Sequence, residues 1–194
     1  MPIRVAGLML LLAMLRASSG TSAGGALIGR PAPPLGLSQW LNSPPLETQD
    51  LQGKVALIRW WTDGCPLCST TAPALRLLQG KFAARGLQVI GIFHPKPPGD
   101  QSLERVRLAG RRLGLPFPLA LDADWKALGR WWLDQQPRDF TSVTFLLDKR
   151  GIIRYVHRGG EFHQDSGGSH RADHRSCLRD YKEIEQTIEK LLAE

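Results

Sequence analysis

Two cysteines separated by two residues, Cys65 and Cys68, are the side chains of this 194-residue chain with the clearest chemical potential. A thiolate at the start of a helix faces unpaired backbone N–H groups and the positive end of the helix dipole, and both lower its pKa. Pro66 suits the first helical position, because proline lacks an N–H that would find no partner there. Cys68 lies one turn further on. We therefore predict that Cys65 is a nucleophile and that Cys68 resolves a mixed disulfide.

The Cys-Pro-Leu-Cys spacing leaves two other interpretations open. A zinc site would need two more ligands, and the chain holds no second Cys-x-x-Cys pair. Two inert core thiols are the third possibility. We favour a redox pair, because a chain of this length with 42% hydrophobic residues does not need a disulfide to fold. No cofactor and no resident metal are expected.

The third cysteine, Cys177, opens a predicted C-terminal helix and shares a face with apolar residues further along it. We expect it to be a core thiol. If that helix begins earlier, His170, His174 and Cys177 lie at i, i+4 and i+7 and would bind zinc or copper. A mixed disulfide through Cys177 is the remaining possibility.

The pattern of the chain predicts the elements that position Cys65. The apolar runs 55–61 and 87–93 are typical of strands buried on both faces, and a helix between them runs from Pro66 to a cap at Gly86. Further along we predict a helix over 100–114 capped by Asp100, a strand over 117–122, a helix over 124–136, a hairpin over 144–157 and a helix over 177–194. Residues 24–50 are expected to form an extended arm. This order predicts an α/β fold, in which sites form where strands end and helices begin.

The first 23 residues predict a secretory signal peptide. Arg4 precedes an apolar run from Val5 to Leu15, and small residues lead to a cleavage site after Ala23. That run is shorter than the roughly 20 residues that span a bilayer, although an uncleaved anchor is the alternative. The chain then holds one domain over 24–194, with its core at about 29–192. A periplasmic or secreted location follows, where thiols become oxidised unless something reduces them.

The formal net charge of +7 does not indicate a nucleic-acid partner. Lys and Arg are scattered, with no zinc finger, RNA-binding signature or basic stripe, so we expect no binding of nucleic acid.

Several segments resemble the thioredoxin-fold proteins of the TlpA and ResA type, also called redoxins. They are "GRPAP", "LQGKVALIRWWTDGCPLC", Pro73, "GLQVIGIF" and "TFLLDKRGIIRYVHRG". The resemblance implies a thioredoxin-like fold, with a central mixed β-sheet flanked by helices and a TlpA-type insertion between Phe93 and Thr141. It also implies an extracytoplasmic thiol–disulfide oxidoreductase that reduces client protein disulfides. "WLNSPPLE" and "FPLALDADW" resemble domains attached to membrane electron transporters, which implies a membrane-bound thiol electron donor.

Three positions depart from that family. Ser142 stands where a cis-proline faces the cysteines, so we expect a trans bond or a reshaped loop. Its hydroxyl would bond either a thiolate or local backbone. Arg59 stands where plain thioredoxins have a buried acid. It would favour a thiolate, pair with Asp63 or Asp122, or reach the surface. Gly64 replaces a tryptophan, which leaves room around the first cysteine.

Further side chains near the pair are candidate modulators of its chemistry. Trp61 and Asp63 directly precede it, and Asp63 would tune the first thiol or cap the helix. His94 follows the second strand, so it lies at the same sheet edge, either as a proton relay or as a surface histidine.

Two rival functions share this fold or pair. A thiol peroxidase of the peroxiredoxin type would use Thr62, three residues before Cys65, but Ile58 and Ser142 stand where that family has proline and arginine. A copper chaperone would bind the metal with Cys65, Cys68 and a histidine.

Overall fold

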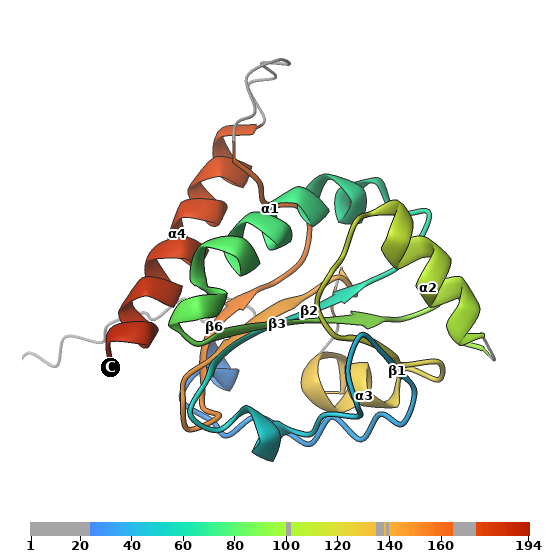
Figure 1. The fold of residues 1–194 in the computed structure, drawn as a ribbon, viewed down its shortest axis with the longest axis horizontal. Helices are drawn as coiled ribbons and strands as arrows, with labels where there is room; N and C mark the ends of the chain where they lie inside the picture. The colour runs from blue at the N-terminus through green and yellow to red at the C-terminus, as the bar shows by residue number, and fades with distance from the viewer. Residues whose placement is uncertain (1–23, 100–101, 135–137, 139, 165–173) are drawn as a thin grey trace, which may run out of the picture.

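The computed structural model describes residues 24–99, 102–134, 138, 140–164 and 174–194, so the predicted signal peptide lies outside the described residues. One six-stranded sheet crosses the molecule in the order β1-β4-β3-β2-β5-β6 (Figure 1). Its strands are β1 (Trp40–Leu41), β2 (Val55–Trp61), β3 (Leu87–Phe93), β4 (Leu119–Leu121), β5 (Thr144–Leu147) and β6 (Ile153–His157). The sheet is mixed: β2, β3 and β4 run parallel, whereas β5, β6 and β1 are antiparallel to their neighbours. The predicted α/β fold with a central mixed sheet is confirmed.

Helices cover both faces of the sheet. They are α1 (Pro66–Phe82), α2 (Leu103–Arg112), α3 (Lys126–Leu128) and α4 (His174–Ala193). Short 3-10 turns lie at η1 (Gly25–Leu27), η2 (Thr48–Leu51) and η3 (Ala83–Arg85), and a π turn lies at η4 (Gly129–Leu133). In Figure 1, α1, α2 and α4 lie on one side of the sheet, and α3 lies on the other with the N-terminal segment. Among the described residues, no helix has the length and apolar character to cross a membrane.

The central strand β2 is buried at every position, as its nearly continuous apolar sequence predicts, and this includes the charged Arg59. Its side chains alternate between the two faces. Leu57 and Trp61 join the core under α1 and α4, and Ile58 and Trp60 join the core on the α3 side. This alternation places Arg59 on the α1 and α4 face, where the site is formed.

Several predicted elements differ from those in the structure. The arm is not wholly extended, because β1 within it pairs with β4 at the sheet edge. The helix predicted from Asp100 begins after Ser102, whose hydroxyl accepts the Arg105 N–H, and Asp100 lies outside the described residues. The last helix begins at His174 rather than Cys177.

The largest difference is the helix predicted over 124–136, which is one short turn followed by a π turn. The neighbouring side chains of Trp131 and Trp132 are both buried against Phe145. A regular helix rotates successive residues by about 100°, so the wider π turn is what lets both indoles face the core.

Candidate active site

The two cysteines meet at the junction of β2 and α1. Gly64 turns the chain there with a φ of 67°, in the left-handed region that glycine adopts without strain. Cys65 caps α1 and Pro66 occupies its first turn. The Cys65 sulfur accepts the backbone N–H of Cys68 at 3.3 Å, which fixes the two residues one turn apart.

Access to solvent distinguishes the two thiols. Cys65 is partly exposed, whereas Cys68 is 4% exposed and belongs to the core under α1. Both are free thiols in this structure. A protein substrate can therefore reach Cys65, whereas Cys68 contacts mainly its neighbours within the fold.

Ser142 faces the buried thiol. Its Oγ lies 3.2 Å from the Cys68 sulfur, in the loop before β5. The cis bond among the described residues is Lys96–Pro97, so the Thr141–Ser142 bond is trans, as predicted. Of the two roles that the sequence left open for this hydroxyl, the structure shows the contact with sulfur.

Arg59 is the charged group nearest the pair and is 1% exposed. Its Nη1 donates to Thr144 Oγ1 at 3.1 Å and its Nη2 donates to the Gly160 carbonyl at 2.8 Å. The guanidinium also lies over the Phe162 ring, 5.6 Å from its centroid. The remaining Nε has no partner among the described residues, and the guanidinium interacts with the Cys68 sulfur.

The acids proposed as partners of Arg59 bind elsewhere, so that part of the prediction is wrong. Asp63 pairs with Arg105, with 2.7 Å between Oδ2 and Nε. Asp122 accepts hydrogen bonds from the Trp60 indole and from backbone N–H groups at the start of α3. Arg59 does not reach the surface either. It is thus a buried cation held by neutral groups, and the charges that raise its pKa against burial are those of Cys68 and then Cys65.

The charge of the pair falls on the inner sulfur. Burial acts to raise the pKa of Cys68, but the Arg59 charge outweighs it, together with hydrogen bonds from Cys65, Ser142 and the Thr62 N–H. The pKa of Cys68 is therefore lowered. The pKa of Cys65 is raised, first by burial and then by its hydrogen bond to the Cys68 sulfur, against the Cys68 N–H and Arg59.

This result corrects the expectation that helix position lowers the pKa of Cys65. Two interacting thiols lose their first proton as a pair, and the single negative charge rests where the surroundings stabilise it best. Here that place is Cys68, because Arg59 and Ser142 lie beside it. Cys65 keeps the shared proton in a hydrogen bond to its partner.

His94 is not the surface histidine considered from sequence. It is fully buried at the end of β3, and its Nε2 bonds Thr141 Oγ1 at 2.8 Å. Burial, followed by the charge of Lys96, lowers its pKa to about 3. A ring with that pKa is neutral at physiological pH, and among the described contacts it bonds Thr141 rather than a cysteine sulfur.

Trp61 and Asp63 support the site from its edges. The Trp61 indole is 3% exposed and packs edge-on against Phe93, with ring centroids 5.0 Å apart. Asp63 ties the turn before Cys65 to α2 through Arg105. Neither side chain bonds a cysteine sulfur among the contacts that the structure describes.

Sequence reasoning missed Thr144, Gly160 and the Thr62 N–H, which hold Arg59 and Cys68. Thr144 was detectable in principle, because a hairpin strand beside β2 places it opposite Arg59. Nothing in the sequence places the Gly160 carbonyl there.

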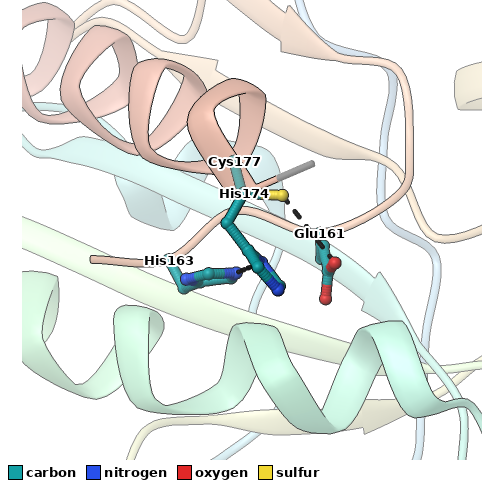
Figure 2. A group of neighbouring side chains, drawn as sticks. All are labelled: Glu161, His163, His174 and Cys177. Atoms are coloured by element: carbon teal, nitrogen blue, oxygen red, sulfur yellow. Dashed lines mark hydrogen bonds between the residues drawn. The ribbon is translucent and has the colours of Figure 1, made fainter. Parts of the chain in front are cut away.

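Cys177 and His174 lie on one side of α4, but their neighbours differ from the predicted set. Glu161 and His163, from the segment after β6, complete a cluster with them, as Figure 2 shows. His170 lies outside the described residues. Cys65 and Cys68 do not belong to this cluster, so the described part of the chain offers no three-ligand site of the kind a copper chaperone would need at the pair.

Comparison with known proteins places this site in a family. The model of the AhpC/TSA family matches residues 28–156. A thiol:disulfide interchange protein DsbE from Xylella fastidiosa is 31% identical over 164 residues, covering 80% of this chain and 76% of that protein. Protein DipZ from Mycobacterium bovis is 30% identical over 127 residues, covering 64% of this chain. This match spans only 18% of the length of DipZ.

Solved structures agree on the fold. A protein from Bacteroides thetaiotaomicron, proposed to be a protein disulfide isomerase, superimposes with a TM-score of 0.66 over 86% of this chain and 91% of its own, at 20% identity. At that identity the likeness concerns the fold alone, and it confirms the thioredoxin-like architecture. The names of the relatives agree with the enzyme class predicted from the sequence, a thiol–disulfide oxidoreductase. The chain belongs to the AhpC/TSA family and has the thioredoxin-like fold of its ResA and DsbE relatives.

Proposed function

We propose that the protein is an extracytoplasmic thiol–disulfide oxidoreductase in which Cys65 and Cys68 alternate between dithiol and disulfide to reduce client proteins. One observation carries the proposal. A partly exposed sulfur lies within hydrogen-bonding reach of a buried one, and an interior cation stabilises the charge of the pair.

The reaction begins when the proton shared by the two sulfurs moves to Cys68, so that the negative charge passes to Cys65. Cys65 then attacks a client disulfide. A mixed disulfide forms, the client S–S bond breaks, and the first client thiolate leaves. Cys68 next loses its proton and attacks the Cys65 sulfur, which releases the second client thiol and leaves a Cys65–Cys68 disulfide. Two electrons have moved from the pair to the client.

The stability of the thiolate determines which client disulfides the pair can reduce. Stabilising a thiolate stabilises the reduced form, so the pair is a weaker reductant than one without Arg59. Structural disulfides of secreted proteins have potentials below about −300 mV and resist it, whereas strained or exposed disulfides have higher potentials. The clients we propose are therefore proteins with labile, accessible disulfides. Leu67, between the cysteines, is 36% exposed, and Phe140, near Ser142, is 46% exposed, so apolar side chains are available to a client segment.

Return to the dithiol needs an electron donor. In an oxidising compartment we propose a membrane-bound thiol donor, whose own cysteines reduce the Cys65–Cys68 disulfide by the reverse exchange. The donor is oxidised as the pair is reduced, so the cycle passes two electrons from the membrane to the client.

Trapping tests the roles of the two cysteines. We expect Cys68→Ser to accumulate a mixed disulfide between Cys65 and a reporter disulfide protein such as insulin, because the resolving thiol is missing. Cys65→Ser is the matched control and should trap nothing, with reductase activity at background. Full activity of Cys65→Ser would show that the nucleophile is assigned wrongly.

Export tests the compartment. When the full chain is expressed in a Gram-negative host, we expect it in the periplasmic fraction with Gly24 as the new N-terminus, whereas a chain without residues 1–23 should stay in the cytoplasm. Recovery of the intact chain in the cytoplasm would overturn the proposed location.

The contacts of Thr62 do not support the peroxidase alternative. Its buried hydroxyl finds no hydrogen-bond partner among the described residues, and so it does not bond the Cys65 sulfur. Rapid turnover of peroxide by the purified protein would nevertheless replace the function proposed here.

A further inference from the structure

We propose that Glu161, His163, His174 and Cys177 form a zinc-binding site that fastens the segment after β6 to the first turn of α4. This proposal does not depend on the redox function. It replaces the ligand set considered from sequence, which contained His170 in place of Glu161 and His163, and it departs from the expectation that the chain has no resident metal.

The four side chains already have the spacing of a metal centre. Their ligand atoms all lie within 4.8 Å of one another. His163 Nε2 is 3.1 Å from His174 Nδ1, and Cys177 Sγ is 3.7 Å from Glu161 Oε1. With zinc bonds of about 2.0–2.3 Å, tetrahedral ligands are separated by about 3.3–3.8 Å, so small side-chain movements suffice. In Figure 2 the four side chains converge between the start of α4 and the facing segment.

Neighbouring groups orient two of the four ligands, His163 and Glu161. His163 Nδ1 lies 3.1 Å from the Gln164 carbonyl. A carbonyl only accepts, so Nδ1 carries the hydrogen and the neutral ring offers its Nε2 lone pair to the cluster. Glu161 Oε2 accepts the Thr70 hydroxyl of α1, which leaves Oε1 facing Cys177. Such outer contacts are typical of metal ligands.

The scaffold behind the cluster is anchored on both sides. Phe162, between Glu161 and His163, is completely buried, so its two neighbours are held at the surface of the core. On α4, His174 and Cys177 are three residues apart and share a face of the helix. Tyr181, one turn beyond Cys177, is 2% exposed and bonds the Gln164 side chain through its hydroxyl. Ligands on anchored elements lose little entropy when a metal binds.

The mixture of donors selects zinc. Two imidazoles, a thiolate and a carboxylate are all ordinary zinc ligands, whereas magnesium and calcium prefer oxygen alone and copper(I) prefers softer sets. Four protein ligands fill a tetrahedral shell. The site is therefore expected to be structural, with no open position for a substrate.

Cobalt(II) spectroscopy tests the site in the full chain carrying Cys65→Ser and Cys68→Ser. Cys177 is then the sole cysteine, so a thiolate-to-cobalt charge-transfer band identifies it as a ligand. We expect one cobalt per chain, displaced by one zinc, and loss of the band in a further Cys177→Ser variant. The absence of the charge-transfer band in the parent protein would overturn the proposal.

Histidine variants then identify the remaining ligands. His163→Gln and His174→Gln should each weaken zinc binding at least about tenfold, and His170→Gln is the matched control that should leave it unchanged. Weaker binding in His170→Gln with unchanged binding in His163→Gln would overturn the proposed ligand set. Because His163 and His174 are partly exposed, these variants should keep the fold, which circular dichroism will check.

Thermal unfolding provides a second measurement. Zinc binds only the folded site, so it should raise the Tm of the parent protein, and Glu161→Gln or His163→Gln should reduce that rise. A rise of the same size in both variants would show that zinc acts elsewhere and would contradict the site.

Discussion

Arg59 gives this member of the family its particular electrostatics. A charged group in the protein interior is costly unless a partner compensates for it, and burial indeed lowers the pKa of this guanidinium. Thr144 and Gly160 supply hydrogen bonds but no charge. The Cys68 thiolate supplies the charge, so cation and thiolate stabilise each other. Oxidation to the disulfide removes that thiolate and leaves Arg59 buried without it, so Arg59 stabilises the dithiol form relative to the disulfide.

Replacement of Arg59 by methionine should make the pair more reducing. Loss of the cation raises the pKa of Cys68, and each unit is worth about 1.4 kcal/mol, or about 30 mV for this two-electron couple. We expect a potential more negative by about 30 mV or more, measured against glutathione buffers. Arg111→Met, on the exposed end of α2, makes the same change in net charge and should leave the potential unaltered. A potential that moves upward in Arg59→Met would refute this role.

Ser142→Ala should have a smaller effect of the same sign. The variant removes one hydrogen bond to the Cys68 sulfur, worth about 1–2 kcal/mol to a charged acceptor, so the pKa of Cys68 should rise by about one unit. The ultraviolet absorbance of the thiolate against pH measures it. Ser69→Ala removes a nearby hydroxyl that bonds the Cys65 carbonyl instead, and should not move the pKa. Equal shifts in both variants would point to a general loss of packing.

Among the elements, the short α3 and its π turn form the cover on the far face of the sheet. Asp122, at the end of β4, holds them there. Its carboxylate accepts the Ala127 and Leu128 N–H groups at 3.1 and 2.7 Å, and the Trp60 indole at 3.2 Å. One side chain thus satisfies the unpaired donors of a helix start and joins it to β2. The same strand carries Arg59 on its opposite face.

Asp122→Ala should destabilise the protein by about 3 kcal/mol. The variant leaves buried N–H donors without acceptors, and each such loss costs about 1–3 kcal/mol. Urea unfolding measures the change. Asp124→Ala is the matched control, because this neighbour is exposed. It accepts the Lys126 N–H at 3.2 Å and makes a surface ion pair with the same residue, which is worth less than about 1 kcal/mol. Similar losses in the two variants would mean that Asp122 does not anchor α3.

At the scale of the whole molecule, two buried histidines make the fold sensitive to acid. His94 has a pKa of about 3 and His157 a pKa of about 4, in both cases chiefly because of burial. His157 contacts Asp180 at 3.4 Å, but with this pKa the ring is neutral at pH 7, so the contact is a hydrogen bond rather than an ion pair. Unfolding exposes both rings to water, where the pKa is about 6.5.

The free energy of unfolding should therefore fall as the pH drops from about 6.5 towards 4. In this window the unfolded chain binds protons that the folded chain excludes, and the cost is about 2 kcal/mol per histidine at pH 5. Chemical unfolding at pH 7, 6 and 5 measures the slope, which His157→Gln should reduce. The ionised carboxylate of Asp148, whose pKa is lowered, also stabilises the fold, and this stabilisation is lost only below about pH 3.8. Constant stability from pH 7 to pH 5 would contradict the prediction.

The sequence by itself determined most strands and helices and the position of the cysteine pair, but not β1 or the short α3. A nearly continuous apolar run, interrupted only by Arg59, predicts β2 because both faces of this strand are buried, and a glycine followed by Cys-Pro marks the start of α1. These signals are local: they depend on side-chain periodicity and on backbone preferences within a few residues. For the same reason the α/β order and the central mixed sheet were predictable.

Only the tertiary structure decided which sulfur carries the charge and which groups surround Cys177. The partners of Arg59 lie 85 and 101 residues away in the chain, and Glu161 meets Cys177 only because α4 packs beside the segment after β6. The local sequence predicted the negative charge on Cys65, because it indicates the start of the helix but not the position of the Arg59 cation near Cys68. Electrostatic and coordination contacts depend on the distance between atoms in space. Residues far apart in the sequence come close enough for such contacts only when the sheet and helices pack.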